Sequence, residues 1–426
     1  MSNAASRRRW PYWLVTALFA AAIAKIPLSG LDIWWHLRTG AALGSSLGTM
    51  SGTTSAWLAT DPFSWTANGA PWPYKDIGAD LLLCLGHRLL GDASLSLWPA
   101  LAVVGIAGAF ARALPNRHWR WPLLLLAATL AASQHRLHAR PMLFSHVAFA
   151  WLLVWLPSLW AERRTAWRAA LAILGLVWVW AWLHRGVLVG ALTLWAWAAA
   201  ALVAWGVAAV KTGRPQRDNP AKPGDSQIAT DRPGPATDAA LRAAALASTG
   251  VAIAASALMC ATANGTAVLT TVIAALDRRD YVDAVDEWAP IPPLTLLREH
   301  GSWLLLLVGA LVALVRLWRA GKATTRGETL PSPVLPAIAF ASLAIGLSVI
   351  ALGASRWIPY AAIAAAHALA AAWRAAPVRS TSPRTTRFGP SSPTTIATSV
   401  AIALCLLWVS ARGGFATPGT LAAGRF

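Results

Sequence analysis

The sequence predicts an all-α protein that crosses a membrane many times, and three observations carry this prediction. Of its 426 residues, 57% are apolar and only 12% are charged, whereas soluble domains carry about a quarter charged residues. Apolar stretches long enough to cross about 30 Å of hydrocarbon recur along the whole chain. The chain has 36 Lys and Arg against 17 Asp and Glu, but it lacks the polar surface over which a soluble basic protein would spread this charge. Disordered chains and nucleic-acid-binding proteins are therefore excluded.

Hydropathy windows predict about eleven membrane spans, within a range of ten to twelve. The first span follows Arg7-Arg8-Arg9 and is too long for a removable signal peptide, so it is expected to remain as a helix with a cytoplasmic N-terminus. The predicted spans are 10–27, 93–114, 120–135, 141–161, 167–183, 186–210, 240–261, 301–317, 332–353, 356–375 and 393–411.

Charge supports this orientation. The N-terminus and the alternate connections carry 23 Lys and Arg against 6 acids, and the remaining connections carry 13 against 11. Because cytoplasmic loops are enriched in Lys and Arg, the first set is expected on the cytoplasmic side of the membrane. We expect a single transmembrane domain over 1–411, followed by an outer tail, 412–426. Within the domain we expect an outer loop, 28–92, a disordered cytoplasmic linker, 211–239, and an outer segment, 262–300, and the stretch 376–394 resembles the linker in composition.

The first outer loop carries Asp32 near its start, at the point where the first span leaves the hydrocarbon. His36 and Arg38 follow within two turns of a helix. A partly desolvated carboxylate at this depth is suited to accept a proton from a hydroxyl or to hold a cation. The alternative is structural, with Asp32 capping a helix or pairing with Arg38.

Two further features of this loop are predicted. Asp61-Pro62 and Asn68-Gly69 indicate a turn, because proline fixes φ and the Asn-Gly pair tolerates positive φ. Residues 76–90 are predicted to form an amphipathic helix on the outer membrane surface, with Asp76 and Asp80 on its solvated face or, alternatively, in the site. Its apolar residues are Ile77, Leu81, Leu82, Leu85 and Leu89, and its other polar residues are His87 and Arg88.

Basic and titratable residues concentrate in short outer turns. The turn 134–141 contains His135, Arg136, His138 and Arg140, a cluster that suits either a bound phosphate or lipid headgroups. The next outer turn carries His184 and Arg185, and a later one carries Arg356. Interfacial arginines are costly, so each is a candidate site residue.

The chain offers weak metal-binding signals. The three cysteines, Cys84, Cys260 and Cys405, are too widely spaced for a disulfide framework or a zinc site. The acidic segment 277–287 supplies ligands for a divalent cation, although its interleaved arginines favour a salt-bridged helix face.

Several motifs together resemble a known group of bacterial membrane proteins. In chain order they are Asp32-Ile33-Trp34-Trp35-His36-Leu37-Arg38-Thr39-Gly40, Asp61-Pro62-Phe63-Ser64-Trp65-Thr66 with Gly69 and Trp72, Arg140-Pro141, Leu183-His184 with Gly186, Glu287-Trp288 with Pro290, and Arg356-Trp357-Ile358-Pro359. The group is similar to the GT-C superfamily, membrane glycosyltransferases that use polyprenyl-phosphate sugars.

The resemblance implies an all-helical fold in which the early Asp of the first outer loop, here Asp32, is the catalytic base and juxtamembrane helices cover a lipid-facing cavity. The group usually has a Glu-Trp pair where this chain has Lys75-Asp76-Ile77, so Asp76 is expected as the second carboxylate, orienting the acceptor or replacing a metal ligand. The group's Asn-x-His-Gly and Asn-Pro-x-Gly motifs are replaced by Trp182-Leu183-His184-Arg185-Gly186 and Ala263-Asn264-Gly265.

The expected function is inverting sugar transfer on the outer face, from a polyprenyl phosphate to a glycan, lipid or protein acceptor. A divalent cation is the candidate cofactor. Asp32 and Asp76 are the expected catalytic residues. The expected substrate- or phosphate-binding residues are His36, Arg38, His135, Arg136, His138, Arg140, His184, Arg185 and Arg356. One alternative is a protein of the same fold that binds a lipid-linked glycan or scaffolds envelope assembly without catalysis. A transporter is disfavoured because the candidate groups gather on one face and no internal repeat occurs.

Overall fold

The computed structural model describes residues 9–25, 32–49, 60–61, 63, 68–69, 76–114, 119–213, 235–262, 265–266, 269–270, 293–324 and 334–375. Within these ranges the protein is all-helical, with twelve α-helices and no strand. The α-helices are α2 (Trp10–Ala24), α3 (Asp32–Thr49), α5 (Ile77–Leu90), α6 (Ala93–Ala113), α7 (Arg120–Ser133), α8 (Met142–Trp155), α9 (Arg163–Leu183), α10 (Val187–Gly213), α11 (Pro235–Cys260), α14 (Pro293–Thr324), α15 (Val334–Gly353) and α16 (Ile358–Ala375). Three short 3₁₀ helices are η1 (Gln134–Arg136), η2 (Leu156–Trp160) and η3 (Ser355–Trp357).

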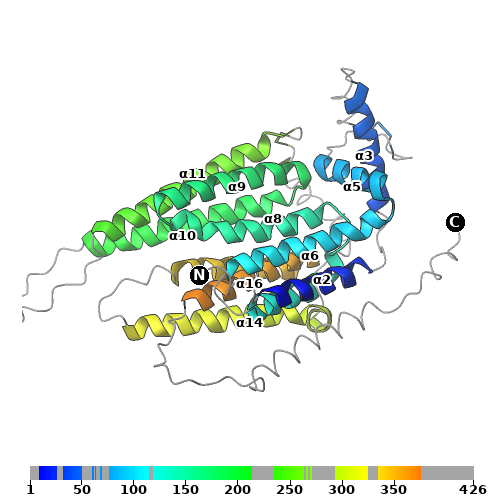
Figure 1. Ribbon diagram of the computed structural model, residues 1–426. Coiled ribbons are helices and arrows are strands. Elements are labelled where there is room, and N and C mark those ends of the chain that lie inside the picture. The colour runs from blue at the N-terminus through cyan, green and yellow to red at the C-terminus, as the bar shows by residue number, and fades with distance from the viewer. Residues whose placement is uncertain are drawn as a thin grey trace, which may run out of the picture.

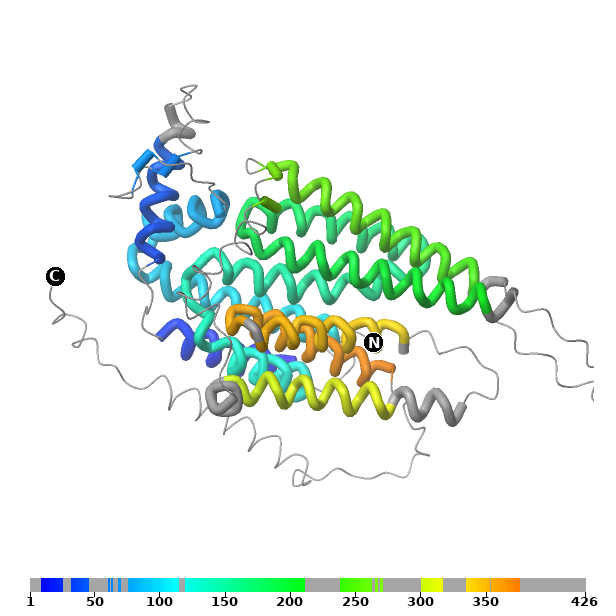
Figure 2. Tube along the Cα trace, turned by 180° about the vertical axis from the view of Figure 1, so that it is seen from behind, coloured from blue at the N-terminus to red at the C-terminus, as the bar shows by residue number. Residues whose placement is uncertain are grey.

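Six helical segments are long and apolar enough to cross a bilayer, so the chain is a multi-pass membrane protein. Figures 1 and 2 show these helices running side by side as one bundle. Large apolar side chains on them, such as Leu192 and Val203, are more than half exposed, as expected for surfaces in contact with lipid. The six segments are Ala93–Ala113, Met142–Trp160, Arg163–Leu183, Val187–Val210, Asp238–Cys260 and Leu335–Leu352.

Helices overlap every predicted span from 10–27 to 356–375, and the last predicted span, 393–411, lies outside the described residues. Beyond the six segments, α2 and residues 300–316 of α14 are apolar but shorter than a full crossing. The ends of the predicted linker 211–239 are helical, because α10 continues to Gly213 and α11 begins at Pro235. The rest of that linker, the acidic segment 277–287, residues 376–394 and the tail 412–426 lie outside the described residues.

The connections that carry the candidate residues lie at one end of the bundle. Helices α7, α9 and α15 end there, and α8, α10 and α16 begin there. The same end carries α3 and α5, with α3 running across the direction of the long helices (Figure 1). We call it the α3–α5 end.

Helix α16 forms the centre of the bundle. It packs against α7, α8, α14 and α15, and every described residue from Ile358 to Ala368 is buried. Most of these residues are alanines, and small side chains allow helices in a membrane to approach closely. The position of α16 is therefore fixed by packing along its whole length, and so is the turn 354–357 that precedes it.

Helix α3 packs against α5, and a glycine brings the two helices together. A Cβ at Gly40 would overlap the backbone carbonyl of Asp80, so only glycine permits this approach. Ile33 and Leu37 of α3 are buried in one apolar cluster with Leu83 of α5.

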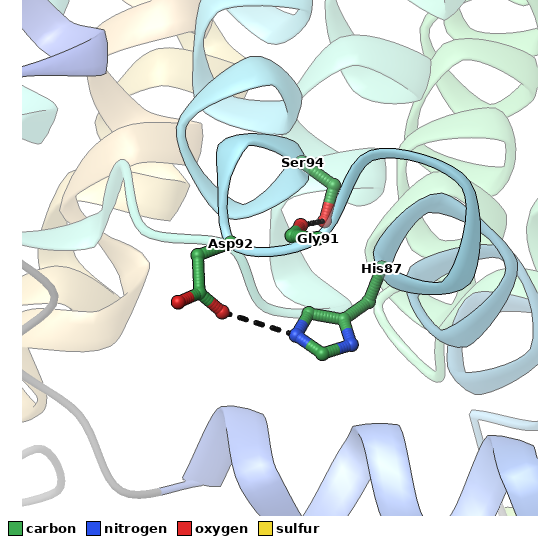
Figure 3. A network of polar contacts seen from close by, with 4 residues as sticks. All are labelled: His87, Gly91, Asp92 and Ser94. Carbon is green, nitrogen blue, oxygen red and sulfur yellow. Dashed lines mark hydrogen bonds and ion pairs between the residues drawn. The ribbon is translucent and has the colours of Figure 1, made fainter.

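The turn between α5 and α6 fixes the direction of α5 relative to the first long helix. Gly91 adopts a φ of +59°, which favours glycine, and the hydroxyl of Ser94 donates to the Gly91 carbonyl over 2.9 Å (Figure 3). His87 and Asp92 form a surface pair across the same turn, with Nε2 and Oδ1 3.1 Å apart.

The prediction that Asp76 and Asp80 lie on a solvated face of α5 is wrong. Asp76 is 8% exposed and Asp80 is 4% exposed, whereas Leu85 and Leu89 are more than half exposed. The helix is oriented by α3, which covers the aspartate side and supplies a polar partner for Asp80. The leucine side is exposed, and the amphipathic pattern predicts that this side lies on the membrane surface.

Candidate functional site

The connection between α7 and α8 holds the first contact of the site. Arg140 lies just before α8, and its Nη2 is 3.3 Å from Oδ2 of Asp32 in the first turn of α3. The alternative pairing of Asp32 with Arg38 is wrong, because residues six apart project from different sides of a helix. Arg38 instead places its guanidinium carbon 5.7 Å from the centre of the Phe63 ring.

Phe63 belongs to the predicted turn after Asp61, and the described residues confirm that turn. The Asp61 carboxylate accepts a hydrogen bond from the Phe63 amide over 2.8 Å, and the Asp61 carbonyl accepts one from Gly69 over 2.7 Å. Gly69 has a φ of +79°, as the Asn-Gly pair predicts. Through Phe63 the turn also contacts Trp35 of α3, with ring centres 5.3 Å apart.

Arg136 joins two connections that are more than two hundred residues apart in the chain. Its Nη2 donates to the hydroxyl of Ser355 over 2.7 Å. Ser355 opens η3, and Arg356 is the next residue. Two of the predicted arginines, Arg136 and Arg356, are therefore neighbours at the α3–α5 end.

Below these turns, Ser145 is the centre of a buried hydrogen-bond network. Its hydroxyl accepts a bond from Trp180 Nε1 over 2.6 Å and lies 2.7 Å from His184 Nδ1. Because the Gly186 amide also donates to Nδ1, over 2.9 Å, that nitrogen carries no proton and Ser145 is its second donor. Tyr360 of α16 hydrogen-bonds to Ser145 as well. The neutral His184 ring is thus held with its proton on Nε2.

Close packing around Gly186 brings the same groups together. A Cβ at this position would lie 2.6 Å from the Tyr360 hydroxyl and 2.7 Å from His184 Nδ1. The glycine of the predicted Leu183-His184-x-Gly186 motif is therefore required by the network.

His146 is a buried imidazole that the sequence analysis did not select. It is 1% exposed, and neither ring nitrogen has a hydrogen-bond partner among the described residues. Its ring centre lies 5.2 Å from that of Tyr360. A histidine inside a predicted span was the available signal, since ionisable residues within membranes are rare.

The two histidines of the 134–141 turn differ in burial. His135 is exposed, and its ring centre lies 6.2 Å from that of His300 in α14. His138 is partly buried, and this burial, assisted by the positive charge of Arg140, lowers the pKa of its imidazole.

The two carboxylates of α5 have different surroundings. Asp80 Oδ1 lies 2.7 Å from His36 Nδ1 of α3. Asp76 precedes α5 at the N-cap position, yet its side chain makes no capping bond, and the buried Oδ1 has no hydrogen-bond partner among the described residues. Asp76 therefore does not close the α5 N-terminus, which leaves its carboxylate for another role.

The structure thus gathers the predicted residues at one end of the bundle. Asp32 contacts Arg140, and Arg136 contacts Ser355. Through Ser145, the buried network links His184 to Tyr360. The Tyr360 side chain also interacts electrostatically with Arg356 and Arg185. In the part of the chain that the structure describes, no group of three or more His, Cys, Asp or Glu residues is arranged to hold a metal. Sequence reasoning did not select Ser145, His146, Ser355 and Tyr360, which the structure adds to the candidate site, and it offered Asp80 only as an alternative.

Comparisons with protein-family models, curated proteins and solved structures found no match for this chain. Fold and site define its class directly: a multi-pass helical membrane protein with a cluster of arginine, histidine and aspartate side chains at one end of its bundle.

Proposed function

We propose that this protein is a GT-C-like membrane glycosyltransferase that transfers a sugar from a polyprenyl-phosphate donor to an acceptor hydroxyl. The observation that carries the proposal is the convergence of Arg136, Arg140 and Arg356, from two separate connections, on the end of the bundle that also carries Asp32. Guanidinium groups at the membrane interface suit a phosphate, because their fixed donors match its oxygens.

The arrangement supports each part of such a reaction. The arginines would stabilise the departing lipid phosphate electrostatically, and the neutral His184 supplies a hydrogen-bond donor on Nε2. Asp32 is the sequence-based candidate for the proton acceptor. Asp76, buried beside this helix pair, would orient the acceptor hydroxyl through the oxygen that has no partner among the described residues.

Charge at the opposite end supports a cytoplasmic N-terminus and a site on the outer face, and the resemblance implies that the membrane is a bacterial inner membrane. Helices α7 and α9 begin at that end, and the residues around their starts are rich in arginine. Cytoplasmic connections have this composition. The arginines concerned are Arg112, Arg120, Arg163, Arg164 and Arg168.

The proposal is tested with purified protein in lipid nanodiscs supplied with polyprenyl-phosphate hexoses. We expect sugar transfer or hydrolysis, and a loss of about a hundredfold or more in kcat for Arg136→Gln, the effect of removing one charged donor from a transition state. Arg164→Gln is the matched control, since Arg164 is exposed at the start of α9, at the opposite end. Equal rates for the two variants would remove Arg136 from the site.

Two other outcomes would replace the proposal. Native mass spectra that show retained lipid-linked sugar without turnover would identify a non-catalytic binding or scaffolding protein. The departures at Lys75-Asp76-Ile77 and Arg185 favour this outcome. Substrate uptake into proteoliposomes would identify a transporter.

A further inference from the structure

Asp80 and His36 form a carboxylate–imidazole pair that bridges α5 and α3. The Asp80 Oδ1 to His36 Nδ1 distance is 2.7 Å, and the side chains are 6% and 17% exposed. An ionised carboxylate only accepts hydrogen bonds, so Nδ1 must be the protonated nitrogen of His36. In the neutral ring the lone pair then lies on Nε2, which has no hydrogen-bond partner among the described residues. This is the tautomer of an imidazole prepared to accept a proton.

Close helix packing holds the pair in place. Gly40 is one turn beyond His36 on α3 and lies directly against the backbone of Asp80. On the other side, Ile33 and Leu37 are buried with Leu83 in one cluster. The pair is therefore flanked by backbone contact and by apolar packing, which restrict the rotation of both side chains.

The pair is adjacent to the predicted catalytic residue. His36 follows Asp32 by four residues on α3, so the two side chains project from the same face with their Cβ atoms about 5–6 Å apart. Asp32 itself is 62% exposed and its Oδ2 is engaged by Arg140. Of the two groups, His36 is the more sheltered from water and the one whose orientation is fixed by a buried partner.

We propose that His36, held by Asp80, is the catalytic residue that accepts the proton of the acceptor hydroxyl, and that Asp32 positions Arg140. This inference rests on the proposed sugar transfer. As the acceptor oxygen bonds to the anomeric carbon, the bond from that carbon to the phosphate oxygen breaks and the phosphate leaves with the electron pair. The hydroxyl proton moves to Nε2 of His36, and the Asp80 carboxylate stabilises the resulting imidazolium. The proton then passes to water when the product leaves.

The test compares His36→Gln, Asp80→Asn and Asp32→Asn in nanodiscs with a polyprenyl-phosphate hexose. We expect His36→Gln to lose at least about a hundredfold in kcat and to abolish the acidic limb of the pH–rate profile. Asp32→Asn should keep that limb, with its effect mainly on KM. His87→Gln is the matched control, because His87 and Asp92 form a similar pair on the surface of the same region (Figure 3). It should turn over like the wild-type protein.

A second measurement follows the pair without relying on turnover. Solid-state ¹⁵N spectra of histidine-labelled protein should show His36 as the Nδ1–H tautomer, and Asp80→Asn should reduce that population, because an asparagine also offers a donor. Wild-type turnover in His36→Gln, an acidic limb lost only in Asp32→Asn, or an Nε2–H tautomer of His36 would each overturn the assignment. A wild-type protein that never transfers sugar would overturn the proposed function itself, and the catalytic role of His36 with it.

Discussion

Replacing Ser145 by alanine should destabilise the protein through a single buried donor. The Ser145 hydroxyl accepts a hydrogen bond from Trp180 Nε1 over 2.6 Å, and the Trp180 side chain is fully buried. His184 keeps its bond from the Gly186 amide in the variant, and the Tyr360 hydroxyl can rotate. The indole N–H of Trp180 is fixed by the buried ring and cannot turn to another acceptor.

The expected cost follows from this difference. A buried donor left without a partner costs about 1–3 kcal/mol, so we expect Ser145→Ala to lower the free energy of unfolding by roughly 2 kcal/mol. Ser133→Ala is the matched control. Ser133 is also a buried serine, but its Oγ has no partner among the described residues, so its removal should be neutral or slightly stabilising.

The assay is reversible unfolding in mixed micelles, followed by tryptophan fluorescence as the fraction of denaturing detergent is raised. Trp180→Phe removes the donor while keeping the serine, and the double variant completes a cycle. Since the two side chains contact each other, the cycle should give a coupling energy of about 0.5–3 kcal/mol. If Ser145→Ala and Ser133→Ala change stability by the same amount, or if the cycle shows no coupling, the network does not carry the stability assigned to it.

Two further predictions concern the α3–α5 end. Gly40→Ala should force α3 away from Asp80 and break the hydrogen bond between Asp80 and His36. Amide hydrogen exchange in α5 should therefore accelerate, while exchange in the long helices stays slow. Unchanged exchange in α5 would contradict the close approach of the two helices. Burial and Arg140 lower the pKa of His138, so the unfolded chain takes up its proton first as the pH falls. Stability should be complete above the unfolded pKa of about 6.5 and decline below it, until the pH reaches the lower folded pKa. His138→Gln should flatten this slope in unfolding measurements, and an unchanged slope would assign it to another group.

Local patterns were sufficient to predict the long apolar helices, the helix after Asp76 and one turn, but not the extent of α3. Six helical segments contain apolar stretches of the length that a bilayer requires, because in lipid the backbone must satisfy its own hydrogen bonds. The turn from Asp61 to Gly69 was equally readable, since aspartate bonds its own backbone two residues on and glycine adopts positive φ. The alternation of helices between two ends predicted only that 134–141 and 354–357 lie at the same end, and not that Arg136 contacts Ser355.

The role of Asp80 was not readable from the helical wheel of 76–90. A wheel gives the polar and apolar sides of a helix, but it does not say which side faces a neighbour. The neighbour here is α3, which is brought close by Gly40 and carries a histidine at the matching height. Ser145 and Tyr360 were missed for a related reason: serine and tyrosine inside apolar helices carry no periodic signal, and their importance arises only from the three helices that meet at His184.

The site is arranged in two layers whose chemistry follows their depth. The ionised partners lie in the connections and first helical turns, where Asp32 and Arg140 are still reached by water or headgroups. The deeper layer contains Ser145, Trp180 and Tyr360, buried groups that share hydrogen bonds without a formal charge. A charge at that depth would cost far more than a neutral hydrogen-bonded group. A ligand suited to both layers must place an anionic group against the arginines and neutral hydroxyls near the deeper layer, and a sugar attached to a lipid phosphate has both.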